Sequence, residues 1–272
     1  MTTMNVQSEL GMMTMEMLKP DDGSAGDLRT CIIFFFGGGF VKRNLKHFQR
    51  QAEYFRSLGV ICILADYHLA SEGDGLSACF ADAQAVMNEV YEKAEQLGID
   101  RHKIVVCGGS AGGTLACWCS LNSSIPCAQV LFNPVLFFGE KNIKKITPKK
   151  IMVQINEETA ELNKIQTYNQ AWGEEFKLYP QHFSAYHKLD HAAIPPTLIL
   201  QGSNDPIAYF GVILFHQKAL ELGNDCHLVL YQGEGHGFFN YDRIDHKFCY
   251  EDTLKQMEVF LRERNLIQRT IK

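Results

Sequence analysis

The sequence lacks several features that would place the chain in the common non-enzymatic classes. It has no long run of charge of one sign among its 26 basic and 31 acidic residues, and its formal net charge is −5. Nucleic acids and anionic membrane surfaces attract strongly basic patches, so we expect neither kind of partner. No apolar window approaches the length of a membrane span, and there are no internal repeats or low-complexity tracts.

Paired cysteine motifs are also lacking. The chain has nine cysteines, and several stand in apolar runs or in a stretch of helical character (Cys62, Cys107, Cys117, Cys119 and Cys226). Their spacing fits neither a zinc site nor a redox motif, so we expect buried, reduced thiols and no metal. Residues 1–10 contain no basic segment followed by an apolar one, the pattern of a secretory signal. These features predict a cytoplasmic protein.

What is present is ordinary globular composition with a regular alternation of elements. The 272 residues are 46% hydrophobic and 21% charged, which is enough apolar material for one large core. Buried strands are predicted at 31–36, 60–65, 104–107, 128–132, 197–201 and 226–231, with helices at 44–58, 76–97, 207–222 and 245–265 between and after them. This order predicts one α/β domain over residues 1–272, with a mainly parallel sheet and helices on both faces.

The strongest motif is Gly-x-Ser-x-Gly at residues 108–112, between the strand at 104–107 and a stretch of helical character. A serine in a strained turn needs neighbours without side chains, and Gly108 and Gly112 give both backbones room to pass. The turn would present the Ser110 hydroxyl above the sheet, with helix amides directed at developing negative charge. The alternative is a glycine-rich turn with an incidental serine, so the other groups of a hydrolytic site must decide.

A histidine and a carboxylate follow two later strands. His236 stands between glycines just past the strand at 226–231, and Asp205 comes directly after the strand at 197–201. Carboxyl ends of parallel strands meet at one edge of a sheet, so both side chains could reach Ser110. The other candidates fit less well. Four histidines are predicted to be structural or at the surface (His68, His182, His187 and His216), and Asp66 and Asp82, which precede the serine, are predicted to be structural. Asp225 precedes its strand and so lies on the opposite edge, and Asp242 follows the histidine and is out of order.

Backbone amides are the expected donors for an oxyanion, because fixed amides need no reorganisation as charge develops. The amide of Ala111, directly after the serine, is one candidate. The loop Gly37-Gly38-Gly39, at the end of the first buried strand, supplies the others and allows close approach of a bound acyl group. Three glycines alone are weak support for an oxyanion hole, but together with Ser110, Asp205 and His236 they support it more strongly.

Residues 138–189 break the strand and helix alternation. The segment is lysine-rich at first and later carries aromatic residues (Trp172, Phe176, Tyr179, Phe183 and Tyr186). An insertion between two core strands on the catalytic side of the sheet suits a lid or cap over a substrate pocket. A peripheral helical excursion packed on the end of the sheet is the alternative.

Taken together, the motifs resemble the α/β-hydrolase fold, in its hormone-sensitive-lipase-like and acetylesterase branches, and the bacterial esterases related to acetyl xylan esterases. The segments that carry the resemblance are 36–40, 108–113, 133–134, 202–205 and 235–239. In that family the order along the chain is serine, acid, histidine. The resemblance covers nearly the whole chain from about residue 10. It implies a triad of Ser110, Asp205 and His236, an oxyanion hole formed by the amides of Gly38, Gly39 and Ala111, and no cofactor.

The sequence departs from the family pattern at three places. Phe36 stands where a histidine usually precedes the glycines, which removes a hydrogen bond that braces the loop. Gly109 stands where aspartate is common, so one polar contact under the serine is absent. The region before residue 31 is short for the early strands of the full fold. We therefore expect the sheet to lack its first strand, and residues 13–17, which alternate methionine with polar residues, to form a half-exposed strand at the edge.

The predicted function is a serine carboxylesterase acting on small or short-chain acyl esters, with acetylated carbohydrates among the candidates. An amide or peptide hydrolase would use the same triad, and a catalytically silent hydrolase fold could serve as a small-molecule receptor. The expected partner is a small-molecule ester substrate. The sequence leaves the oligomeric state open, with a homodimer among the options.

Overall fold

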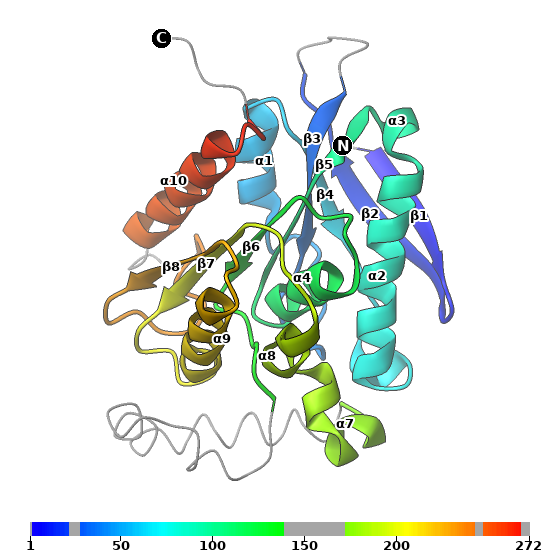
Figure 1. The fold of residues 1–272 in the computed structure, drawn as a ribbon. Helices are drawn as coiled ribbons and strands as arrows, with labels where there is room; N and C mark the ends of the chain where they lie inside the picture. Colours follow the sequence, from blue (N-terminus) through cyan, green and yellow to red (C-terminus); the bar gives the residue numbers. More distant parts are fainter. Residues whose placement is uncertain (1, 22–27, 139–171, 243–246, 268–272) are drawn as a thin grey trace.

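The computed structural model describes residues 2–21, 28–138, 172–242 and 247–267, and its centre is an eight-stranded sheet (Figure 1). The order across the sheet is β1-β2-β4-β3-β5-β6-β7-β8. The strands are β1 (Thr2–Ser8), β2 (Gly11–Leu18), β3 (Arg29–Phe35), β4 (Ile61–Ala65), β5 (Ile99–Gly109), β6 (Ala128–Phe132), β7 (Thr197–Gly202) and β8 (Cys226–Tyr231). Strands β3 to β8 are parallel, whereas β2 is antiparallel to β1 and β4.

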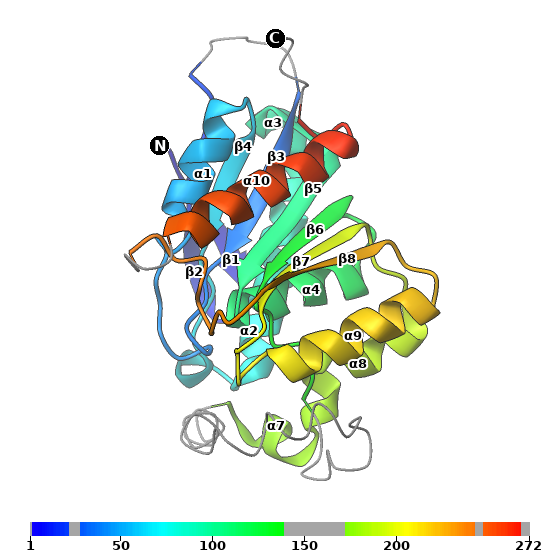
Figure 2. The ribbon, with the colours of Figure 1, turned by 90° about the vertical axis from the view of Figure 1, so that its left-hand side faces the viewer.

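Two layers of helices cover the sheet. Figure 2 shows α1 and α10 on one side and α2, α4 and α9 on the other. The α-helices are α1 (Gln49–Ser57), α2 (Leu76–Glu92), α3 (Ala94–Leu97), α4 (Ala111–Asn122), α7 (Glu174–Leu178), α8 (Ala185–Lys188), α9 (Tyr209–Glu221) and α10 (Lys247–Glu263). Short 3₁₀ turns are η1 (Ala70–Glu72), η3 (Pro180–Phe183) and η4 (Leu189–His191).

Alternate side chains of the central strands enter two different cores. On β3, Ile33 and Phe35 pack into the core beside α2, α4 and α9, while Ile32 and Phe34 pack into the core beside α1 and α10. Strands buried on both faces need apolar residues at successive positions, which is why they stand out in the sequence as continuous apolar runs. The predicted α/β-hydrolase architecture, a mainly parallel sheet between two layers of helices, is confirmed.

The amino-terminal predictions need correction. Met13, Met15 and Met17 lie on β2 and are buried, at 0–3% exposed, because β1 pairs with β2 and forms the edge of the sheet instead. The prediction of a strand at the edge was therefore wrong, and so was the prediction that the sheet lacks its first strand. In β1 only Val6 is buried, so its sequence carries little alternation to reveal it. Gly11, at φ 138°, closes the tight turn that joins the two strands.

Two helix boundaries also differ from the sequence-based ranges. The helix predicted from residue 44 begins at Gln49, because residues 44–48 form turns that bring His47 back toward Gly37. The helix predicted over 76–97 is divided into α2 and α3 at Lys93. Strands β6 and β8 have the predicted bounds.

Most of the predicted cap, residues 139–171, lies outside the described residues, so its role as a lid stays a prediction. Its later part, from Trp172, packs Phe176 and Phe183 into the same core as α2 and α4, and α8 contacts α4 and α9. Within the part of the chain that the structure describes, none of the helices combines the length and the apolar character needed to cross a membrane.

Candidate active site

Ser110 lies in the sharp turn between β5 and α4, where the sequence predicts it. Its φ is 53°, in the left-handed region that costs a non-glycine residue about 1–3 kcal/mol. The Ser110 amide donates to the carbonyl of Phe132 on β6 at 2.9 Å, and the Ser110 carbonyl accepts from the amide of Thr114 at 3.0 Å. These bonds to the sheet and to α4 hold the serine in its strained conformation.

The turn depends on two glycines that allow backbones to touch. A Cβ atom on Gly108 would lie 2.2 Å from the carbonyl oxygen of Gly112. A Cβ atom on Gly112 would lie 2.1 Å from the carbonyl oxygen of Phe35, at the end of β3. Real side chains do not approach this closely, so the crossing of β5, α4 and β3 requires glycine at both positions.

The structure brings together the three side chains that the sequence analysis selects. His236 lies in the loop after β8, and its Nε2 is 2.9 Å from Ser110 Oγ. On the other side of the imidazole, Nδ1 is 2.8 Å from Asp205 Oδ2, in the loop after β7. Asp205 and His236 stand 95 or more positions after Ser110 in the sequence, and the three side chains thus form one continuous hydrogen-bonded chain at the carboxyl end of the sheet.

Asp205 is only 3% exposed and is surrounded by donors. Its Oδ1 accepts from the amides of Ile207 and Ala208, at 2.9 and 3.1 Å, and its Oδ2 accepts from Gln201 Nε2 at 2.9 Å as well as from His236. Burial raises the pKa of Asp205, but the hydrogen bond and charge of His236, with the bonds from Gln201 and Ile207, outweigh it and lower the pKa overall.

The charge of Asp205 selects the tautomer of His236 and thereby the role of Ser110 in their hydrogen bond. Because the carboxylate is ionised near neutral pH, it accepts a hydrogen bond from Nδ1–H of His236. The neutral imidazole then has its lone pair at Nε2, where it can accept the hydroxyl hydrogen of Ser110. This is the arrangement in which a serine hydroxyl can be deprotonated as it attacks.

The loops that carry Asp205 and His236 are fastened to each other and to the sheet. The amide of Asn204 donates to the carbonyl of Glu234 at 2.9 Å. The amide of Gly237, next to His236, donates to Oδ1 of Asn133 at the end of β6, at 3.0 Å. The imidazole is therefore carried on a backbone that is fixed on both sides.

The glycine loop that follows β3 lies directly against the serine: a Cβ atom on Gly37 would be 3.4 Å from Ser110 Cβ. Several polar groups of this loop are bonded away from the serine. Three of its carbonyls accept hydrogen bonds: that of Phe36 from Tyr67 Oη (3.0 Å), that of Gly38 from the Lys42 amide (3.1 Å), and that of Gly39 from Trp172 Nε1 (2.8 Å). The Gly37 amide donates to His47 Nδ1 at 3.0 Å. Within the described residues, the amides of Gly38 and Gly39 have no acceptor.

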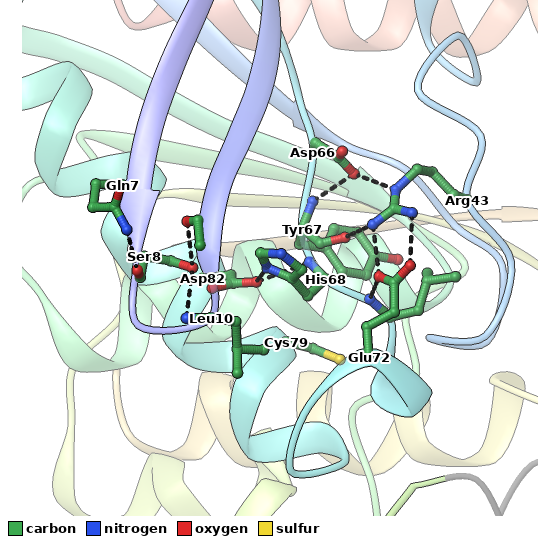
Figure 3. A network of polar contacts seen from close by, with 12 residues as sticks. Gln7, Ser8, Leu10, Arg43, Asp66, Tyr67, His68, Glu72, Cys79 and Asp82 are labelled. Carbon is green, nitrogen blue, oxygen red and sulfur yellow. Dashed lines mark hydrogen bonds and ion pairs between the residues drawn. The ribbon is translucent and has the colours of Figure 1, made fainter.

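An arginine anchors the far end of the same loop. The guanidinium of Arg43 donates from Nε to Asp66 at 2.8 Å and from both Nη atoms to the carboxylate of Glu72, at 3.0 and 2.7 Å (Figure 3). Beside it, buried Asp82 accepts from the amide and the imidazole of His68, at 2.8 Å each. Asp66 and Asp82 thus make anchoring contacts, apart from the Ser110, His236 and Asp205 group.

The structure also explains two departures from the family pattern. Phe36 stands where the family usually has a histidine, and the loop is braced instead by His47, whose imidazole accepts from the Gly37 amide ten residues earlier. At Gly109, a Cβ atom would lie 2.7 Å from the ring of Phe239 and 3.1 Å from that of Phe48. Aromatic rings therefore fill the space next to Gly109, and a side chain there would force the ring of Phe239 to move.

Sequence reasoning missed the residues that support the site from a distance, namely His47, Trp172, Tyr67 and Gln201. The missing histidine at position 36 was a usable signal, because it meant that the loop loses one bracing hydrogen bond. A buried glutamine four residues before Asp205 was another. The bond from Trp172 to Gly39 had no signal, since the two residues are 133 positions apart.

Other reactive groups do not form a second centre in the described part of the chain. Burial raises the pKa of the thiols of Cys62, Cys107 and Cys117 well above the usual value, which leaves them protonated and weakly nucleophilic. Among the described residues, no group of three or more His, Cys, Asp or Glu side chains is placed to hold a metal ion.

Comparison with known proteins assigns the chain to a family. The family described as alpha/beta hydrolase fold matches residues 32–240. The esterase Est2 of the planctomycete Thermogutta terrifontis is similar over nearly its whole length. Its propionate-bound structure and its structure phosphonylated by cyclosarin are each 30% identical to this chain, with a TM-score of 0.80, and the match covers 99% of this chain and 96% of theirs.

A curated relative matches over a shorter region. Esterase LipI of Mycobacterium tuberculosis is 37% identical over 86 residues, which are 31% of this chain and 27% of that protein. The match therefore spans about a quarter of the length of that relative. The fold, the extent of the family match and the esterase structures agree. This chain belongs to the α/β-hydrolase fold family, as an esterase-type hydrolase of its hormone-sensitive-lipase-like branch.

Proposed function

We propose that this protein is a serine carboxylesterase that hydrolyses small, short-chain acyl esters. Ser110 is the nucleophile, His236 the general base and then the general acid, and Asp205 the residue that orients and stabilises the imidazole. The observation that carries the proposal is the unbroken chain of hydrogen bonds from Ser110 Oγ to His236 at 2.9 Å and on to Asp205 at 2.8 Å.

The proposed reaction has two halves. As Ser110 Oγ attacks the ester carbonyl, its proton passes to His236 Nε2, and the imidazolium is stabilised by the buried carboxylate of Asp205. The imidazolium then gives this proton to the departing alkoxide, which leaves an acyl group on Ser110. In the second half, a water loses a proton to His236 and attacks the acyl carbonyl. The bond between the acyl carbon and Ser110 Oγ then breaks, His236 returns the proton to Ser110 Oγ, and the carboxylic acid is released.

The oxyanion of each tetrahedral intermediate needs fixed donors. We assign this role to the backbone amides of Gly38, Gly39 and Ala111. Support comes from the position of the loop, since Gly37 approaches Ser110 closely, and from the bond that ties the carbonyl of Gly38 to the amide of Lys42. In a peptide group the carbonyl and the following amide point in opposite directions, so the bond to the Gly38 carbonyl fixes the direction of the Gly39 amide.

We expect the enzyme to prefer esters with a short acyl group. The similar esterase of Thermogutta terrifontis has a structure with bound propionate, a three-carbon acid. We extend this preference to the present chain and place acetate esters, acetylated carbohydrates included, among its candidate substrates. Its acetylesterase character rests on this likeness and on the sequence resemblance.

The first test is hydrolysis of p-nitrophenyl acetate by Ser110→Ala. We expect a loss of about 10⁴-fold or more in kcat with unchanged folding, because the nucleophile is removed while the core is untouched. Ser57→Ala is the matched control: its hydroxyl bonds to the carbonyl of Tyr54 on the surface of α1, so activity should not change. Substantial activity in Ser110→Ala would refute the proposal.

A panel of substrates sharpens the assignment. Initial rates on p-nitrophenyl esters from acetate to octanoate, on acetylated xylo-oligosaccharides, and on matched N-acyl anilides should be highest for the short esters. Anilide hydrolysis at comparable kcat/KM would instead indicate an amide hydrolase on the same triad. A folded protein that hydrolyses none of them would favour a receptor.

A further inference from the structure

His47 lies between the glycine loop and the loop that carries His236, and it contacts both. Its Nδ1 accepts a hydrogen bond from the amide of Gly37 at 3.0 Å, and its Nε2 is 2.8 Å from Oδ1 of Asn240. A backbone amide can only donate, so Nδ1 carries no proton and Nε2–H donates to Asn240. The two contacts therefore fix one tautomer of a neutral imidazole.

Asn240 continues the connection toward the proposed general base. Its amide Nδ2 and its backbone amide both donate to the carbonyl of Gly237, at 3.0 and 3.1 Å. Gly237 directly follows His236. A chain of hydrogen bonds thus runs from Gly37 in one loop, through His47 and Asn240, to the backbone beside His236 in the other.

The surroundings of His47 leave its ring little freedom. The ring packs against Phe48 and Phe239, with centroids 4.7 and 5.5 Å away, and its Cε1 would be 3.5 Å from a Cβ atom on Gly109. Burial lowers the pKa of His47 and outweighs the opposite effect of the bond to Asn240, and the charge of His236 lowers the pKa further. Neutral His47 is the form that accepts from the Gly37 amide.

A fixed Gly37 amide has a consequence for the two amides that follow it. Glycines are the most mobile backbone positions, and oxyanion donors act best when their direction is set before charge develops. The carbonyls of Gly38 and Gly39 are held by the Lys42 amide and by Trp172 Nε1. His47 fixes the beginning of the same loop, on the side next to Ser110.

We propose that His47 is a positioning residue for ester hydrolysis: its unprotonated Nδ1 holds the Gly37 amide and thereby sets the direction of the Gly38 and Gly39 amides toward the oxyanion. Asn240 keeps the imidazole in the required tautomer. This inference rests on the proposed function, because it assigns a role within the same site.

Two substitutions separate the two ends of the imidazole. In His47→Asn the side-chain amide oxygen lies near the position of Nδ1 and can still accept from Gly37. In His47→Gln the amide lies near the position of Nε2, and the acceptor for Gly37 is lost. We expect kcat for p-nitrophenyl acetate to fall about 10- to 100-fold in His47→Gln, less than the loss of a whole oxyanion donor, with KM changed less than about threefold. His47→Asn should retain most of kcat.

His102→Asn is the matched control, because this exposed histidine lies within β5, well before its catalytic end. It should behave as wild type. Equal kcat values in His47→Asn and His47→Gln would overturn the proposal. If wild type is active and Ser110→Ala is not, that outcome refutes only the role of His47, whereas an inactive wild type refutes the proposed function with it.

A second experiment changes the protonation state of His47 without substituting the residue itself. In Asn240→Asp a carboxylate faces Nε2 and favours the imidazolium, whose Nδ1–H opposes the Gly37 amide. The acid limb of the kcat profile should move to higher pH. His236, the proposed general base, directly precedes Gly237, which Asn240 contacts, so the same carboxylate also lies near it. The His47→Asn, Asn240→Asp double variant therefore decides: loss of the added shift supports the proposal, and its persistence would assign the shift to His236 and overturn it.

Discussion

The turn at Ser110 and the loop at Gly37 to Gly39 meet at one site but keep their shapes by different means. The serine turn is set by backbone contact, with Gly108 and Gly112 packed against neighbouring carbonyls at distances that exclude a side chain. The backbone of the glycine loop can adopt several conformations, and polar side chains from outside the loop fix it, among them His47 and Trp172.

The comparison indicates how robust each part should be. Steric exclusion allows no side chain at these glycines but does not depend on a hydrogen-bond partner. A substitution in the serine turn should therefore abolish folding and activity completely or have no effect. Several side chains together fix the glycine loop by hydrogen bonds, so the removal of any one bond should lower kcat only in part.

The largest effect is expected for Gly112→Ala. The new methyl group would lie 2.1 Å from the carbonyl oxygen of Phe35 and 2.5 Å from that of Phe36, so β3 and α4 must separate. We expect a loss of more than about 4 kcal/mol in the free energy of unfolding and no measurable esterase activity. Urea denaturation would measure it, with Gly223→Ala as the control at an open position, where a Cβ meets nothing within 4 Å. Gly223 has φ 78°, so a cost of about 1 kcal/mol is expected there. A Gly112→Ala protein as stable and active as wild type would contradict the steric account.

Asp205→Asn should leave the fold intact and lower kcat by about 10⁴-fold, because an amide cannot stabilise the imidazolium and favours the wrong tautomer of His236. Steady-state kinetics and thermal melting measure the two parts. A small loss of kcat would show that the imidazole is oriented by something other than the carboxylate.

The same carboxylate predicts a pH effect on stability. The pKa of Asp205 is lowered in the folded protein, so its stabilising contribution is complete above about pH 4 and is lost as the pH falls through the folded-state pKa. The melting temperature of wild type should therefore fall more steeply than that of Asp205→Asn below about pH 4. Parallel curves in that range would contradict the lowered pKa.

The smallest effect is expected for Trp172→Phe. This change removes the donor to the Gly39 carbonyl and leaves that acceptor unsatisfied, a cost of about 1–3 kcal/mol. We expect kcat to fall about tenfold with KM little changed, because the other ties of the loop remain. The second tryptophan provides the control: Trp118 lies on α4, where it contacts Phe80 and Lys188, and Trp118→Phe should retain kcat. A complete loss in Trp172→Phe would show that one bond alone holds the loop.

The same difference explains what could be predicted from the sequence. The serine turn is encoded within five residues, and the buried strands are continuous apolar runs, so both were predicted with nearly correct positions. The position of Asp205 and His236 followed from one rule, that carboxyl ends of parallel strands share an edge. Strand β1 was missed because a mostly exposed edge strand carries little apolar alternation.

The residues that fix the glycine loop could not be predicted from the sequence, because their contacts form only in the folded protein. Tyr67, His47 and Trp172 reach the loop through tertiary packing, from positions 31, 10 and 133 residues away from their partners. Nothing local distinguishes these side chains from ordinary core or surface residues. Only the absent histidine at position 36 indicated that a substitute was needed.

The central claim is that Ser110 is an activated nucleophile, and covalent labelling tests it most directly. Folded wild-type protein would be treated with a fluorophosphonate probe and analysed by intact mass and peptide mapping. The account predicts one adduct per chain, on Ser110, with labelling slowed by orders of magnitude in His236→Ala. Labelling at another residue, no labelling of folded protein, or equal rates in His236→Ala would contradict it.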